Sequence, residues 1–198
     1  QAKLVPNDSV PQQGFGTTLA MDGDVAAISA DRASIDQALY IFERDEVSGD
    51  WLEAAKFSNP DDDDVYLGWG LSVRGDTVIA GTPELGSGVP GPTFQFERDP
   101  VTGAWMETAS LVSSDLEGSD RFGGSTALDA TTLLVSATGD DDHPSSDGSV
   151  YAFERRPRGM SVAGLRPDRA VCRNRTTGEV LNLRPFTLTV LDCASAGL

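Results

Sequence analysis

The side chains with the clearest capacity for chemistry are carboxylates gathered in two loops. The first group is Asp61, Asp62, Asp63 and Asp64, and the second is Asp140, Asp141, Asp142 and Asp147. Calcium takes six to eight oxygen ligands, largely from carboxylates and backbone carbonyls. Both loops are therefore candidate calcium sites, and calcium is the cofactor that they would hold. Neither has the alternating Asp-x-Asp-x-Asp-Gly spacing of a dedicated calcium loop, so ordinary solvated loops are the alternative, and no cofactor is required.

The single histidine, His143, lies in the second acidic loop. It is either an additional metal ligand or a solvated loop residue. It has no evident serine partner for nucleophilic catalysis, and the chain contains neither a Gly-x-Ser-x-Gly elbow nor a glycine-rich phosphate loop. No pair of carboxylates is singled out for glycoside hydrolysis. We therefore expect a protein that is not an enzyme.

The charge is strongly negative and unevenly distributed. The formal net charge is −16, made up of −20 over residues 1–155 and +4 over residues 156–198. An acidic body repels nucleic acid and anionic membranes, and no run of about 18 apolar residues could span a bilayer. Neither is expected as a partner. The acidic surface serves solubility, or else it receives the basic tail of a neighbouring molecule.

The elements that must position these loops form an internal repeat. Phe-Glu-Arg triplets end at Arg44, Arg98 and Arg155, which are 54 and 57 residues apart. Aromatic–glycine pairs begin at Phe15, Trp69 and Phe122, which are 54 and 53 residues apart. Trp51 and Trp105 are separated by 54 residues. Three markers with one shared period indicate three copies of a single structural unit.

Each unit has the pattern of four short strands. In the first unit the strands are expected at residues 15–21, 25–30, 38–43 and 51–57, with Asp22-Gly23 forming a tight hairpin turn. Four antiparallel strands at such a period are typical of β-propeller blades. We predict an all-β fold with three four-stranded antiparallel blades at about 14–57, 68–111 and 122–155, within residues 1–158. A C-terminal β module follows at 159–198.

The pattern of these units resembles that of a known family. Phe15-Gly16, the Asp22-Gly23 hairpin, Tyr40-x-Phe42-Glu43-Arg44 and Gly49-x-Trp51 resemble the FG-GAP repeats of bacterial surface and secreted proteins. Those repeats are similar to the blades of the integrin α-subunit propeller, and the resemblance covers residues 3–155. Integrin-type repeats carry a calcium loop between their first two strands. Here only two- or three-residue turns stand in that place, too short to surround a calcium ion.

Three blades do not close a ring, because propellers typically have four to eight. The third unit lacks a Gly-x-Trp strand after Arg155, whereas Ala2, Lys3, Leu4 and Val5 match the ends of the fourth strands at 55–57 and 109–111. We hypothesise that these four residues are an assembly strand that completes the third blade of another copy. Strand exchange would produce a homo-oligomeric six-bladed ring or a filament. Alternatively, residues 160–165 supply the missing strand, or the sequence is a fragment.

The tail contains both cysteines, Cys172 and Cys193. No histidine or further cysteine nearby completes a zinc site. A disulfide is expected, as in oxidising compartments, with two buried thiols as the alternative. The tail resembles a small C-terminal module of some secreted bacterial repeat proteins. The chain starts at Gln1 without an initiator methionine, which indicates a secreted or cell-surface protein whose signal peptide has been removed, or only where this sequence was cut.

Two classes of function fit this pattern. The first is a structural or adhesive protein that assembles with itself. The second is a propeller-type binding module for glycans or a surface protein, with its ligand held by loops on one face. Trp51, Trp69 and Trp105 are interpreted as packing residues of the blades rather than as a sugar-stacking platform. We favour self-assembly, because the incomplete ring needs a partner strand.

Overall fold

The fold was described from a computed structural model of the chain. It describes residues 2–8, 14–30, 37–58, 66–83, 91–113, 115–117, 120–141 and 148–154, and the backbone of three short strands in the tail. Every regular element within these ranges is a β-strand, which confirms the all-β prediction. The same ranges contain no helix long and apolar enough to cross a membrane.

The first sheet consists of four antiparallel strands in chain order. They are β1 (Phe15–Asp22), β2 (Val25–Ala30), β3 (Ala38–Arg44) and β4 (Trp51–Ser58). These strands coincide with the predicted ones to within a residue. Asp22 lies opposite Val25, and Gly23 takes a φ of 57° in the tight turn between them, a conformation that glycine adopts without steric cost.

The second and third sheets repeat this order. The second contains β5 (Leu71–Arg74), β6 (Thr77–Gly81), β7 (Thr93–Arg98) and β8 (Trp105–Leu111). The third contains β9 (Phe122–Leu128), β10 (Thr132–Ala137) and β11 (Ser149–Glu154), and its fourth place is taken by β14 (Thr189–Leu191) from the tail. In the tail, β12 (Cys172–Arg173) pairs with β13 (Val180–Leu181). Three antiparallel sheets are thus confirmed, and they do not close into a ring.

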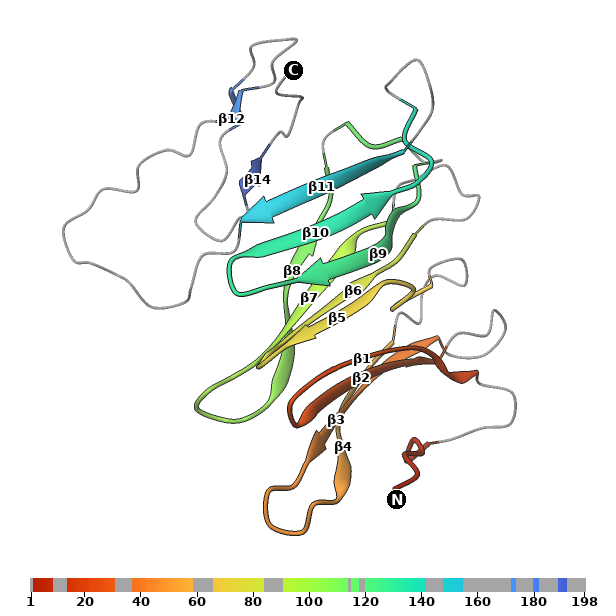
Figure 1. The fold of residues 1–198 in the computed structure, drawn as a ribbon, viewed down its shortest axis with the longest axis vertical. Helices are drawn as coiled ribbons and strands as arrows, with labels where there is room; N and C mark the ends of the chain where they lie inside the picture. The colour runs from red at the N-terminus through yellow and green to blue at the C-terminus, as the bar shows by residue number, and fades with distance from the viewer. Residues whose placement is uncertain are drawn as a thin grey trace, which may run out of the picture.

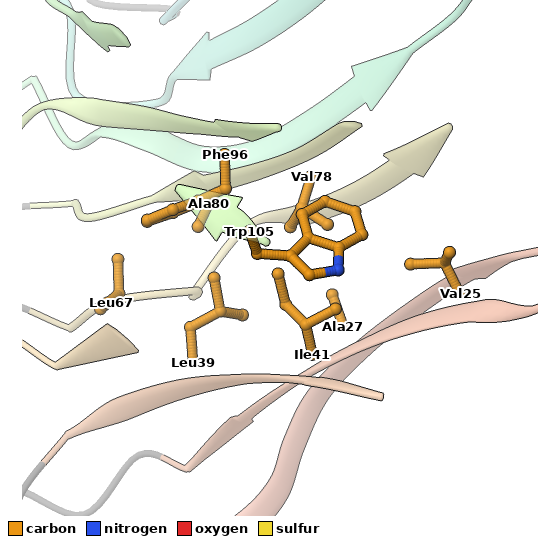
Figure 2. Close-up of a cluster of buried hydrophobic side chains, with 9 residues drawn as sticks. All are labelled: Val25, Ala27, Leu39, Ile41, Leu67, Val78, Ala80, Phe96 and Trp105. Carbon is orange, nitrogen blue, oxygen red and sulfur yellow. The ribbon is translucent and has the colours of Figure 1, made fainter. Parts of the chain in front are cut away.

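The sheets stack face to face in chain order (Figure 1). We call the face that a sheet turns toward the next sheet its forward face, and the opposite one its rear face. The forward face of the first sheet includes Ala27, Leu39 and Ile41, and it packs on Val78 and Phe96 of the second sheet. Figure 2 shows these side chains meeting in one layer with the indole of Trp105. Successive residues of each strand point to opposite faces, so each sheet has two apolar faces.

The second sheet packs on the third in the same way. Its forward residues Ile79 and Leu111 contact the rear face of the third sheet, where Leu133, Val135 and Phe153 are buried. The strand registers show which residues of the three sheets are equivalent, because Val25, Thr77 and Thr132 each lie opposite the glutamate of Phe-Glu-Arg in their own sheet. With these equivalences, a forward face meets a rear face at both contacts between sheets. This repeated forward-on-rear packing is the stacking mode of propeller blades.

One predicted correspondence between the repeats is wrong. The residues equivalent to Phe15-Gly16 and Phe122-Gly123 are Leu67-Gly68, not Trp69-Gly70, because the three glycines share φ values of 94°, 92° and 89°. Leu67 is 4% exposed in the core between the first two sheets, whereas Trp69 is 44% exposed. The conserved feature of the repeat is therefore a left-handed glycine after a buried apolar side chain. An aromatic ring is not essential there.

The glycine at this position also sets how closely adjacent sheets approach. A Cβ added to Gly123 would lie 2.9 Å from Thr93 Oγ1 and 3.0 Å from Gly81 Cα. The equivalent Gly16 has nothing within 4 Å of such an atom. The φ of Gly16 is nearly the same as that of Gly123. The two sites therefore differ in whether another sheet packs against them, not in backbone conformation.

We expect Gly123→Ala to destabilise the protein more than Gly16→Ala does. Both substitutions place a side chain at positive φ, at a cost of about 1–3 kcal/mol. Only the Gly123 substitution also forces the second and third sheets apart, at a further cost of about 1–3 kcal/mol. Urea denaturation at low protein concentration measures both. Equal losses for the two variants would contradict the close packing of the sheets at Gly123.

Candidate functional site

The predicted calcium loops are only partly described by the structure. Asp61 to Asp64, Asp142, Asp147 and the adjacent His143 lie outside the described residues. Asp140 and Asp141 are described. Within the described ranges, no three carboxylate, histidine or cysteine side chains are grouped to hold a metal ion. Calcium binding in these loops stays a prediction.

Asp140 serves as a hydrogen-bond acceptor in the third sheet. Its side chain is largely buried, and its Oδ2 accepts a hydrogen bond from the Tyr151 hydroxyl at 2.9 Å. Burial, followed by donation to Asp140, raises the pKa of Tyr151 well above its usual value. The Asp140 carbonyl accepts from Gly148 N at 3.3 Å. These contacts fasten the two ends of the β10–β11 loop to the sheet.

A shallow hollow lies where the first turns of the three sheets meet. It is lined by Asp22, Arg74, Gly75, Asp76, Thr77 and Ala130. Asp22 Oδ2 accepts a hydrogen bond from Gly75 N at 2.8 Å, so this carboxylate joins the first sheet to the second. The hollow is open to solvent, and the described contacts of Asp22 give it a structural role.

The two ends of the stack differ from its interior, and they form the candidate site. At one end is the rear face of the first sheet, where Ile28, Tyr40 and Phe42 are buried although none of the described sheets packs on it (Figure 1). At the other end lies the forward face of the third sheet, where Leu134 is 40% and Val150 is 60% exposed. The equivalent residues of the first sheet, Ala27 and Leu39, are completely buried. The end at the third sheet therefore presents a face that is covered in the interior of the stack, whereas the residues of the rear face of the first sheet are already buried.

The N-terminal segment, residues 2–8, lies on the rear face of the first sheet. Leu4 packs against its apolar cluster. Asp8 accepts a hydrogen bond from the Tyr40 hydroxyl at 2.9 Å and pairs with Lys56 Nζ at 2.6 Å. The hydrogen bond from Lys56 is the main influence that lowers the pKa of Asp8. The segment thus covers part of the face that a preceding sheet would occupy.

Leu4 has a counterpart in the interior of the stack. It precedes Phe15 by 11 residues, as Leu111 precedes Phe122. Leu111, at the end of β8, packs on the rear face of the following sheet, and Leu4 packs on the rear face of the first. The predicted assembly strand, Ala2 to Val5, therefore has the place of a fourth strand belonging to a sheet ahead of the first. Residues 2–6 form no strand in the structure.

The edge that this segment was predicted to complete has a strand of the same chain beside it. β14 pairs antiparallel with β11, with Val190 opposite Phe153 and Thr189 opposite Glu154. Residues 160–165, the alternative source of this strand, lie outside the described residues. So does Cys193, and the disulfide with Cys172 of β12 stays a prediction.

Sequence reasoning missed a polar contact between the sheets. Glu43 Oε1 accepts a hydrogen bond from Trp105 Nε1 at 2.6 Å, and Glu43 Oε2 pairs with Arg98 Nη2 at 2.9 Å. Glu43 belongs to the first sheet, and both donors belong to the second. We call this set of contacts the inter-sheet clamp. Its signal in the sequence is the Glu-Arg pair of the repeated Phe-Glu-Arg triplet.

We expect Glu43→Ala to destabilise the protein by about 1–3 kcal/mol, because it leaves the largely buried Trp105 indole without its acceptor and removes one ion-pair partner of Arg98. Glu43→Gln should cost less, since its amide oxygen still accepts from the indole. Urea denaturation measures both, with Glu46→Ala in the exposed β3–β4 turn as the control. A loss for Glu43→Ala no larger than the control would contradict the clamp.

Comparison with protein families supports this description of the repeat. The model of the FG-GAP repeat matches residues 1–42 and 105–153. The second match begins with β8 and continues through β9 to β11, so it joins the fourth strand of one sheet to three strands of the next. The first match correspondingly begins in the N-terminal segment.

A comparison with curated proteins found no match. FG-GAP repeats form modules of the β-propeller type, occur typically in extracellular proteins and generally serve in binding or adhesion. The two matched segments, the three antiparallel sheets and their forward-on-rear packing agree with one another. Residues 1–42 and 105–153 match the FG-GAP repeat, and the all-β fold is consistent with a propeller-type protein that carries such repeats.

Proposed function

We propose that this protein is a non-enzymatic, extracellular structural or adhesive module that assembles with further copies of itself through the open ends of its sheet stack. The observation that carries the proposal is the exposed forward face of the third sheet. Val150 is 60% exposed there, whereas Leu39, its equivalent in the first sheet, is completely buried under the second sheet.

Covering this face is energetically favourable. Complete burial of an exposed valine or leucine side chain contributes roughly 1.5–3 kcal/mol. Leu134 and Val150 lie on one face, because Leu134 pairs with Ala152 and Val150 with Ser136 in neighbouring strands. A sheet docked on this face would bury both side chains. The surface that matches it in shape and polarity is the rear face of a sheet from the same repeat.

The N-terminal segment would act as the exchanged strand. It already lies on the rear face of its own first sheet, so a third sheet docked there would have this segment along its outer edge. The segment would then replace β14 beside β11 of the neighbouring copy. Two copies joined at both ends would form a ring of six sheets, within the usual range for propellers. A contact that does not close would form a filament.

The test is the mass of the protein in solution at micromolar concentration. We expect sedimentation to give a multiple of the 20.9 kDa chain. Val150→Asp should return the protein to the mass of one chain, because a carboxylate cannot be buried there without a partner. Val101→Asp, at a 90% exposed position in the β7–β8 turn, is the matched control and should leave assembly unchanged. A monodisperse single chain, or assembly by Val150→Asp as tight as that of the control, would contradict the proposal.

One observation favours glycan binding as a second candidate. Trp69 is 44% exposed and meets Tyr66 edge to face at 5.6 Å, unlike the buried Trp105. An exposed indole, held in place by a neighbouring ring, can stack on a sugar ring. If the protein binds a glycan at Trp69, one sugar should raise the melting temperature of the wild type. The same sugar should leave the melting temperature of Trp69→Ala unchanged. If no sugar in a broad panel does so, the candidate fails.

A further inference from the structure

We infer that Glu154 of one copy binds Arg44 and Trp51 of the next, repeating between molecules the inter-sheet clamp found within the chain. The inference rests on the proposed function and commits to one occupant for the open forward face, which is a second copy of this chain. It also specifies the register in which that copy docks.

The acceptor half of a clamp is present at the third sheet. Glu154 lies opposite Thr132, just as Glu43 lies opposite Val25 in the first sheet. Glu154 therefore has the position from which Glu43 reaches the following sheet. Its side chain is exposed, and among the described residues none forms a hydrogen bond or ion pair with that side chain.

The donor half is present at the first sheet. Arg44 lies opposite Trp51 across β3 and β4, as Arg98 lies opposite Trp105 across β7 and β8. Arg44 and Trp51 are thus the first-sheet equivalents of the two residues that bind Glu43.

The contacts of Arg44 within its own sheet match those of Arg98. Arg44 Nε donates to the Gly49 carbonyl at 3.2 Å, and Arg98 Nε donates to the Gly103 carbonyl at 3.4 Å. Arg44 lies 4.0 Å from Asp24, and Arg98 lies 3.8 Å from Asp76. Within the described ranges, the contact that Arg98 has and Arg44 lacks is the one to a glutamate of a preceding sheet. Accordingly, Arg44 is 53% exposed and Arg98 is 39% exposed.

The two halves cannot meet within one chain. β3 and β4 lie at one end of the stack and β11 lies at the other, with the second sheet between them (Figure 1). The described polar contacts of the N-terminal segment are with other residues, because Asp8 binds Tyr40 and Lys56 and Asn7 N donates to Glu53. When the forward face of the third sheet stacks on the rear face of the first sheet of a second copy, Glu154 reaches Arg44 of that copy. This is the contact that Glu43 makes with Arg98 within the chain. Between two strongly acidic molecules, such a pair also supplies a specific attraction.

The experiment is a charge swap followed by sedimentation equilibrium at 150 mM salt. Glu154→Arg and Arg44→Glu should each weaken assembly by about tenfold or more, because each places like charges at the contact. The double variant, with both substitutions in one chain, should assemble to within a few-fold of the wild type. A mixture of the two single variants should also assemble, since each then meets an opposite charge. Glu107→Arg, at an exposed position of β8, makes the same change of charge outside the clamp and is the control.

The outcomes separate the clamp from the proposed function. A wild type that stays a single chain overturns both. A wild type that assembles together with both single variants overturns the clamp alone. The clamp is also overturned if the single variants fail but neither the double variant nor the mixture recovers. All variants are expected to fold as single chains, because Glu154 and Arg44 are exposed there.

Discussion

Each sheet of this protein has two apolar faces, and the whole structure depends on covering both of them. The alternation of side chains along a strand places Ala27 on one face and Ile28 on the other. Within the chain the requirement is met by stacking, with the forward face of one sheet on the rear face of the next. The three described sheets satisfy it twice, and at the ends Leu134 and Val150 stay exposed whereas Tyr40 is buried. The chain covers part of the rear face with its own N-terminal segment.

Polar contacts at the margins give the stack a fixed register that apolar burial alone would not. The clamp from Glu43 to Trp105 and Arg98 joins the first two sheets near one end of the strands. Asp22 accepts a hydrogen bond from Gly75 N in the equivalent turn of the second sheet. Thr126 Oγ1 of the third sheet lies 3.1 Å from Ser72 Oγ of the second. Directional contacts of this kind favour one alignment over its neighbours. They also mean that the open ends carry specific unmatched groups as well as exposed apolar surface.

The sequence was sufficient for the architecture because it repeats. The alternating strands and the tight turn at Asp22 are local patterns, and β1 to β4 follow them closely. The sequence wrongly matches Trp69 to Phe15, because each is an aromatic residue that precedes a glycine. The structure instead repeats a glycine at positive φ after a buried side chain, and in the second unit that side chain is Leu67. The place of β14 beside β11 and the clamp at Glu43 depend on contacts between distant segments. No local pattern reports such contacts, although the recurring Glu-Arg pair was a usable signal.

If incomplete stacking is the basis of this protein's role, its purified form should contain more sheets than one chain provides. Electron microscopy of the protein at micromolar concentration addresses this directly. We expect class averages of closed six-sheet rings, or filaments with a regular sheet spacing. Uniform particles of three sheets, unchanged as the concentration rises, would contradict the account.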